Sequence, residues 1–253
     1  MIRLVRAEFD KLFTTKLWLG LTLGGLALAS AFLAITIGLD GMAENPNPPV
    51  STPEGQRNLF ATATGASTFA LLLGIIAVTG EFRHQTATPT FLATPRRDRV
   101  IAAKLVAYAV VGVVFGALTL LVAIAIAAPW LAAIDTELSL TQHGVPGTMA
   151  GVIAAVALYT LLGVGIGALV RNQIAAVVGA LVYLFVIEAF VRGLPVVRDY
   201  YPYSPGGASE ALTATTDPVI EHVQPWQGGL LLAGYALVFC ALGSWLSVRR
   251  DIA

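Results

Sequence analysis

The sequence predicts an all-α integral membrane protein that crosses a bilayer six times. Three observations support this class: 57% of the 253 residues are hydrophobic, only 12% are charged, and the charged residues separate six long apolar stretches that hold at most one charge each. A soluble domain carries about 25% charged residues, so this chain has too few to cover a water-exposed surface. In lipid, backbone groups must be satisfied within each segment, which favours helices.

The apolar stretches place the spans, because roughly 20 apolar residues cross a hydrocarbon core. We expect membrane helices at 17–39, 59–80, 105–128, 146–170, 174–191 and 228–248. The fifth stretch contains the only acid within a predicted span, Glu188. The whole chain, residues 1–253, is expected to form a single transmembrane domain.

The distribution of Lys and Arg predicts the orientation, since cytoplasmic loops are enriched in both. With a cytoplasmic N-terminus, only Arg57, Arg192 and Arg198 of the fifteen Lys and Arg residues fall in outer segments. Both termini are therefore expected in the cytoplasm. Twelve arginines against three lysines weakly indicate a GC-rich bacterial genome, so we expect a multi-pass protein of the bacterial inner membrane.

Two segments outside the spans are expected to contain helix. In residues 1–16, apolar residues recur at spacings of three and four between basic ones, which predicts an amphipathic helix in the membrane interface. The alternative is a plain extension of the first span. Residues 192–227 form the longest outer segment, where 209–213 suit a short helix, whereas the proline-rich residues 40–58 predict an irregular loop.

The cytoplasmic stretch GEFRHQTATPTFLATPRRDRVIAAK, residues 80–104, is dense in charge and too long for a tight turn. Its threonines offer helix caps and its two prolines interrupt any long helix. It predicts either a short helix along the membrane that leads into the third span, or a basic loop that only sets the topology.

Motifs for independent catalysis are absent from the sequence. There is no GxxxxGK[ST] phosphate loop and no HExxH, and the three histidines, His84, His143 and His222, are scattered. Gly163 and Gly167 form a GxxxG pair inside an apolar stretch, which favours close helix packing. We therefore expect no enzyme activity, no directly bound cofactor or metal, and no nucleic-acid partner.

End to end, the chain resembles the membrane subunits of the type 2 ABC transporter family, bacterial permeases that pair with a separate ATPase. The resemblance rests on AEFDKLFTTKLW near the N-terminus, on GEFRHQTATPTFLATPRRDRVIAAK after the second span, and on the glycine-rich end of the fourth span followed by Arg171 and Asn172. The long outer segment before the last span also fits.

The resemblance implies a coupling helix after the second span that docks on the ATPase, which supplies ATP and Mg²⁺. Carried over to this sequence, the coupling contact comprises Glu81, Phe82, Arg83, His84, Thr86 and Thr88, with Arg96, Arg97 and Arg99 at its rim.

It also implies two permease subunits, here expected to be a homodimer, with a substrate path between them lined by the second and fifth spans. Candidate path residues are Thr62, Thr64, Ser67, Thr68 and Glu188. The expected cargo is a drug, antibiotic, peptide or lipid-like amphipath, which would associate the protein with multidrug or antibiotic resistance.

Two alternatives to an exporter subunit stay open. One is a non-transporting scaffold or immunity protein of the same fold, and the other is an ion-coupled secondary transporter. The second alternative needs membrane-embedded acids, for which only Glu188 qualifies. For Glu188 itself, either it snorkels outward or pairs with Arg192 at i+4, or it faces the substrate path and attracts cationic cargo.

Overall fold

The computed structural model describes residues 1–42, 45–83 and 97–249. Within this part helices, joined by loops and turns, are the regular secondary structure, and six of them are long and apolar enough to cross a membrane. They comprise α2 (Leu17–Gly38), α3 to α4 (Pro53–Ala61 and Ser67–Arg83), α6 (Arg97–Ala133), α7 (Val145–Val170), α8 to α9 (Gln173–Val182 and Glu188–Gly193) and α11 (Pro225–Arg249). The predicted all-α class with six such helices is therefore confirmed.

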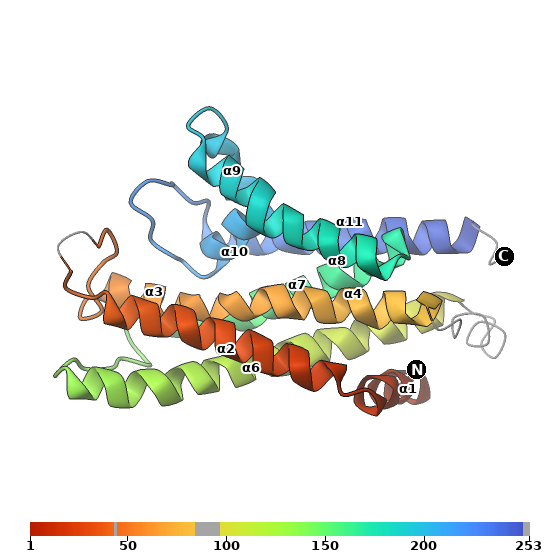
Figure 1. Ribbon diagram of the computed structural model, residues 1–253, viewed down its shortest axis with the longest axis horizontal. Helices are drawn as coiled ribbons and strands as arrows, with labels where there is room; N and C mark the ends of the chain where they lie inside the picture. The colour runs from red at the N-terminus through yellow and green to blue at the C-terminus, as the bar shows by residue number, and fades with distance from the viewer. Residues whose placement is uncertain (43–44, 84–96, 250–253) are drawn as a thin grey trace.

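The helices form an elongated bundle with two distinct ends (Figure 1). One end, called the α1 end, holds α1 (Ile2–Thr14), the end of α4, and the starts of α6 and α8. In Figure 1, α1 is seen nearly end-on, so it runs across the bundle rather than along it. The opposite α10 end holds η3 (Arg198–Tyr203) and α10 (Pro205–Leu212).

Helix α7 lies at the centre of the bundle and packs against α4, α6 and α11. Its contact with α4 depends on glycine, because a Cβ on Gly163 would lie 2.1 Å from the Leu71 carbonyl oxygen and one on Gly74 would lie 2.1 Å from that of Thr160. A Cβ on Gly167 would meet the Ile75 carbonyl at 2.8 Å. The prediction that Gly163 and Gly167 serve helix packing is thus confirmed.

Helices α2 and α8 to α9 are the least buried of the six. In Figure 1, α8 and α9 diverge from the bundle toward the α10 end. Between them lies η2 (Tyr183–Ile187), one turn of π-helix. Large apolar side chains on this stretch are exposed, among them Val178, Phe185 and Phe190.

Several helices are longer than the sequence predicted. Residues 53–58, expected in an irregular loop, begin α3, because the Thr52 hydroxyl accepts from the Gly55 N–H at 3.1 Å and Pro53 occupies the first turn. A five-residue 3₁₀ segment, η1 (Thr62–Ala66), then leads into α4.

Helix α6 begins at Arg97 and continues past Pro129 to Ala133. The predicted 209–213 helix is α10, which starts earlier, at Pro205.

Candidate functional site

Four charged side chains from three helices meet at the α1 end. The Lys104 ammonium on α6 contacts the carboxylates of Glu8 on α1 and of Glu81 on α4, the latter at 3.0 Å. The Lys11 ammonium on α1 lies 2.7 Å from Glu8 and 2.7 Å from Glu81. We call Glu8, Lys11, Glu81 and Lys104 the α1 ion cluster. With two carboxylates and two ammonium groups, it is charge-neutral.

Two members of the α1 ion cluster are buried, since Glu8 is 4% exposed and Lys104 is 8% exposed, whereas Lys11 and Glu81 are partly exposed. Buried charges are tolerated when they are paired and hydrogen-bonded. Burial alone would lower the pKa of the Lys11 ammonium, but the carboxylates of Glu81 and Glu8 outweigh it and hold that pKa above its ordinary value. Lys11 therefore stays charged, and the cluster ties α1 to α4 and α6.

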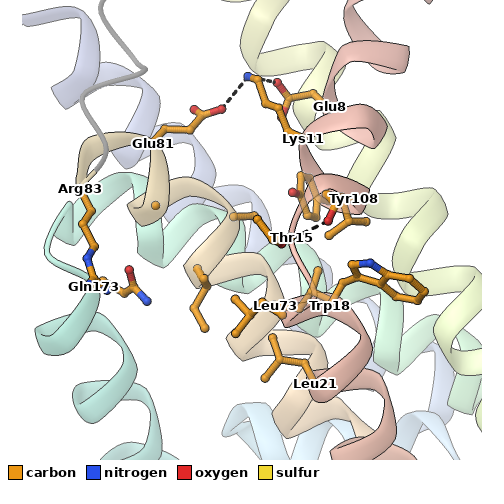
Figure 2. Close-up of a pocket in the computed structure, with 15 residues that line it drawn as sticks. Glu8, Lys11, Thr15, Trp18, Leu21, Leu73, Glu81, Arg83, Tyr108 and Gln173 are labelled. Atoms are coloured by element: carbon orange, nitrogen blue, oxygen red, sulfur yellow. Dashed lines mark hydrogen bonds and ion pairs between the residues drawn. The ribbon is translucent and has the colours of Figure 1, made fainter.

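A cavity of about 460 Å³ opens beside the cluster between α1, α2, α4 and α8, and we call it the α1 groove. Figure 2 shows Glu8, Lys11 and Glu81 together at one end, Leu21 and Leu73 at the other, and Arg83 and Gln173 along one side. Trp18 and Tyr108 also line it. The groove thus has a charged end and an apolar end.

The end of α4 is held to the turn between α7 and α8. The Phe82 ring lies 5.2 Å from the Arg171 guanidinium, within the range of a cation–π contact, and Phe82 packs on the apolar cluster around Leu73 and Tyr108. Arg171 ends α7 in a left-handed conformation with φ 58°. Asn172 then caps α8 by accepting from the Ala175 N–H at 3.1 Å.

The structure places only part of the predicted coupling contact. Glu81 and Arg83 line the α1 groove, Phe82 packs inside the bundle, and Arg99 is exposed. The remaining predicted coupling residues lie outside the described residues or, for Arg97, have an undescribed side chain: His84, Thr86, Thr88, Arg96 and Arg97.

The predicted path residues of the second span lie where η1 meets α4. The hydroxyls of Thr62 and Thr64 donate to carbonyls of their own helix at 2.6 and 2.7 Å, on Leu59 and Ala61. Thr68 is half-buried, and the Ser67 hydroxyl is buried and finds no hydrogen-bond partner among the described residues.

Glu188, the remaining path candidate, caps α10. Its carboxylate accepts from the Gly206 N–H at 2.8 Å and is 7% exposed. A carboxylate at a helix N-terminus is favoured by the unpaired N–H groups there. Among the described residues it makes no hydrogen bond with the predicted path residues of the second span.

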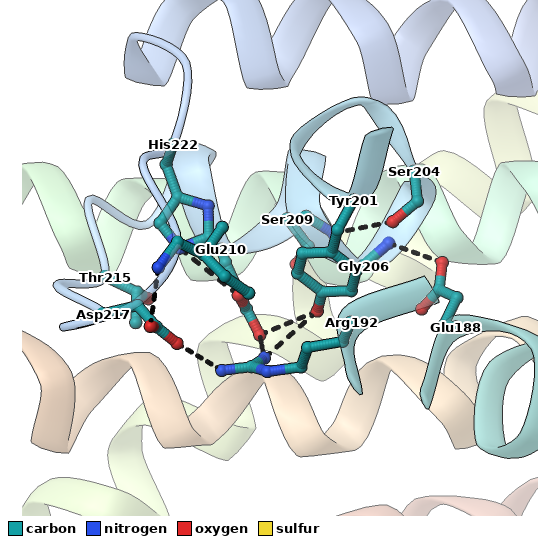
Figure 3. A network of polar contacts seen from close by, with 12 residues as sticks. Glu188, Arg192, Tyr201, Ser204, Gly206, Ser209, Glu210, Thr215, Asp217 and His222 are labelled. Atoms are coloured by element: carbon teal, nitrogen blue, oxygen red, sulfur yellow. Dashed lines mark hydrogen bonds and ion pairs between the residues drawn. The ribbon is translucent and has the colours of Figure 1, made fainter. Parts of the chain in front are cut away.

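The i+4 spacing predicted a pair between Arg192 and Glu188. Among the described residues, Arg192 contacts other carboxylates instead. Its guanidinium lies 2.5 Å from Glu210, contacts Asp217, and donates to the Tyr201 hydroxyl at 3.2 Å. His222 lies 3.4 Å from Glu210. Figure 3 shows this α10 network, made of Arg192, Tyr201, Glu210, Asp217 and His222.

Burial chiefly explains two shifted pKa values in the α10 network. Burial and the Glu210 carboxylate raise the pKa of the Tyr201 hydroxyl, which donates to Glu210 at 3.0 Å. Burial lowers the pKa of His222 despite the nearby carboxylates. Both shifts favour the uncharged form of the side chain, a neutral imidazole at His222 and a protonated phenol at Tyr201.

Sequence reasoning missed the α1 ion cluster and the α10 network. One signal was present: Glu8 lies three residues after Val5 and four before Leu12, on the apolar side of its helix. A carboxylate at such a position requires a buried partner. Nothing in the sequence identified that partner as Lys104.

A scan against models of known protein families finds no match to this chain, and a search of curated proteins finds none either.

Proposed function

We propose that the chain is the permease subunit of an ATP-driven exporter of the type 2 ABC transporter family. In this proposal the α1 end is cytoplasmic and α1 lies in the membrane interface. A separate ATPase subunit binds residues 81–99 and supplies the ATP and Mg²⁺. The α10 end faces outward, in the inner membrane of a bacterium.

The α1 ion cluster is the observation that best supports this proposal. Lys11 and Lys104 bridge the end of α4, before residues 84–96, and the start of α6, after them. Both flanks of the proposed ATPase contact are thus tied to α1, the α6 flank by a buried ion pair and the α4 flank by part-buried ones. A displacement of this segment by the ATPase would therefore move α1, α4 and α6 together, which is what coupling requires.

A second permease copy completes the proposed substrate path. The apolar faces of α2 and of α8 to α9 are the least covered in the bundle, so they are available to a partner subunit or to lipid. The cargo is proposed to be a small amphipath, namely a drug, antibiotic, peptide or lipid-like molecule.

Site-specific photocrosslinking in intact cells tests the ATPase contact. A photoreactive residue at Thr88 should capture a protein that carries a GxxxxGK[ST] loop, and one at the exposed Ser51, at the other end of the bundle, should not. Copurification of the pair with ATPase activity that depends on the permease would support the function. Capture at Ser51 alone would contradict it.

Cysteine labelling tests the orientation separately. In a variant with Cys240 replaced by Ala, a cysteine at Ser51 should react with an impermeant maleimide in intact cells. Cysteines at Thr14 and Thr94 should react only after lysis. Labelling of Thr14 in intact cells would reverse the proposed topology.

A further inference from the structure

We infer that the α1 groove binds one anionic glycerophospholipid from the membrane leaflet at the α1 end, with its phosphate at Arg83 and one acyl chain along Trp18 and Leu21. The inference concerns a binding site in the permease chain itself and holds whether or not the chain couples to an ATPase.

The position of the groove along the helices places it at the headgroup level. It is lined by the first turns of α2, the last turns of α4 and the first residue of α8. These are ends of helices long enough to span the membrane, so they lie where hydrocarbon meets headgroups. Trp18 suits that depth, because its ring is apolar and its N–H is polar.

Charge gives the groove a preference for an anion. The α1 ion cluster is neutral in itself, with Lys11 and Lys104 matched to Glu8 and Glu81. Arg83 also lines the groove and is exposed. Among the described residues no ion pair involves Arg83, so no carboxylate there neutralises the guanidinium on this side of the groove.

Hydrogen-bond donors on the same side reinforce that preference. Gln173 lines the groove at the first turn of α8, and Figure 2 places its side chain on the side of the groove where Arg83 lies. The N-terminus of α8 adds a partial positive charge near Gln173. A guanidinium, an amide and a helix N-terminus together suit a phosphate.

The opposite end of the groove suits an acyl chain. Figure 2 places Leu21 and Leu73 at that end, and the apolar side chains of Ile76 and Ala77 also line the groove. Apolar surface gains about 25 cal/mol for each Å² removed from water. The cavity of about 460 Å³ falls within the roughly 300–1,000 Å³ of small-molecule sites, enough for a headgroup phosphate and the first part of one chain.

The groove is preformed, because the α1 ion cluster holds its α1 wall against α4 and α6. The buried contact from Lys104 to Glu8 and the part-buried contact from Lys11 to Glu81 set the position of this wall. A lipid entering the groove therefore does not have to order α1, which reduces the entropy cost of binding.

Native mass spectrometry of the purified full-length chain tests the inference. The protein is incubated with an equimolar mixture of phosphatidylglycerol, phosphatidylethanolamine and phosphatidylcholine of identical acyl chains. One phosphatidylglycerol should be retained in preference to the other two. Arg83→Gln should weaken its binding about tenfold, the effect of losing one hydrogen bond to a charged group.

Two further variants separate a specific site from general attraction. Arg6→Gln removes the same charge from an exposed position on α1 that does not line the groove, and should retain the lipid. Ala77→Phe adds a ring to the lining of the groove and should expel the lipid while Arg83 stays in place. A single elution peak and an unchanged melting temperature show that each variant is folded.

Equal retention of the three lipids, or a preference for phosphatidylethanolamine, would overturn the inference. So would equal losses in the Arg83→Gln and Arg6→Gln variants, because the attraction would then be that of a basic surface.

Discussion

Lys104 on α6 and Glu8 on α1 form a buried ion pair between residues 96 positions apart in the sequence. The pair joins an amphipathic helix to a membrane-spanning one. Glu81 completes the contact from α4, 3.0 Å from the same ammonium. Three helices at the α1 end therefore share one set of charges, and the loss of any member leaves the other three with an unbalanced charge.

Removal of the Lys104 ammonium should destabilise the protein strongly. Lys104→Met removes one of the two ammonium groups that contact both Glu8 and Glu81. Breaking a buried ion pair costs about 3–5 kcal/mol. The double variant with Glu8→Gln should recover part of this loss. Thermal unfolding in detergent would show the effect as a lower melting temperature.

Lys16→Met provides the matched control for this cluster. Lys16 is an exposed lysine just before α2, where a substitution costs within about 0.5 kcal/mol. If Lys104→Met and Lys16→Met had equal melting temperatures, the cluster would not stabilise the α1 end.

Hydrophobicity predicted the six long helices because lipid makes apolar length decisive. The packing role of Gly163 and Gly167 could also be predicted, since close helix approach has a local sequence pattern, GxxxG. Helix bounds were less accurate: the cap at Thr52 and the proline at 53 extended a helix into a segment that composition assigned to a loop.

The side-chain partners could not be predicted, because they come from distant parts of the chain. The i+4 spacing favoured a pair between Glu188 and Arg192, whereas Arg192 contacts Glu210 and Asp217, 18 and 25 residues away. Tertiary contacts with two carboxylates outweigh a local pair that is worth about 0.2–0.5 kcal/mol.

Phe82 should affect coupling through its contact with Arg171. In the proposed complex, Phe82→Ala removes the ring that holds the end of α4, and ATPase activity that depends on the permease should fall. Phe82→Tyr keeps a ring beside the guanidinium and should retain that activity. Arg171→Gln should reproduce the loss, measured with copurified subunits.

The Phe82 prediction separates two roles for this residue. If Phe82→Ala abolishes copurification but Arg171→Gln leaves the activity intact, Phe82 contacts the ATPase directly, as the sequence predicted. Intact activity in both variants would remove Phe82 from the coupling contact.

Acidification should loosen the α10 end through His222. Burial holds its pKa below the ordinary 6.5, so the unfolded chain takes up a proton that the folded chain does not. The free energy of unfolding therefore falls as pH drops from about 7 through 6.5 toward the lower folded pKa. The melting temperature should decrease over this range.

His222→Gln should flatten this pH response, and His143→Gln, at an exposed position, should leave it unchanged. The other charged groups facing His222, namely Glu210, Asp217 and Arg192, remain in both variants. An identical pH response in the wild type and His222→Gln would exclude His222 as its source.

Glu188 should act as the cap of α10, because its carboxylate accepts from the Gly206 N–H at 2.8 Å. Glu188→Gln keeps an acceptor of similar size and should assemble normally. Glu188→Leu leaves a buried N–H unpaired, at a cost of about 1–3 kcal/mol. In detergent, the melting temperature of Glu188→Leu should be lower than that of Glu188→Gln.

Gly206→Ala tests the same contact from the other side. A Cβ at this position would lie 2.3 Å from a Glu188 carboxylate oxygen, so the carboxylate must move and the cap weakens. Gly193→Ala, where a Cβ meets no atom within 4 Å, is the matched control and should cost less.

Transport separates the capping role from the substrate path. If Glu188 only caps α10, a normally assembled Glu188→Gln variant moves cationic and neutral cargo as well as the wild type does. If it also faces the path, transport of cationic cargo falls more than that of neutral cargo, because the attracting charge is lost. Equal transport of both classes would remove Glu188 from the substrate path and leave it as the residue that holds α10 against α9.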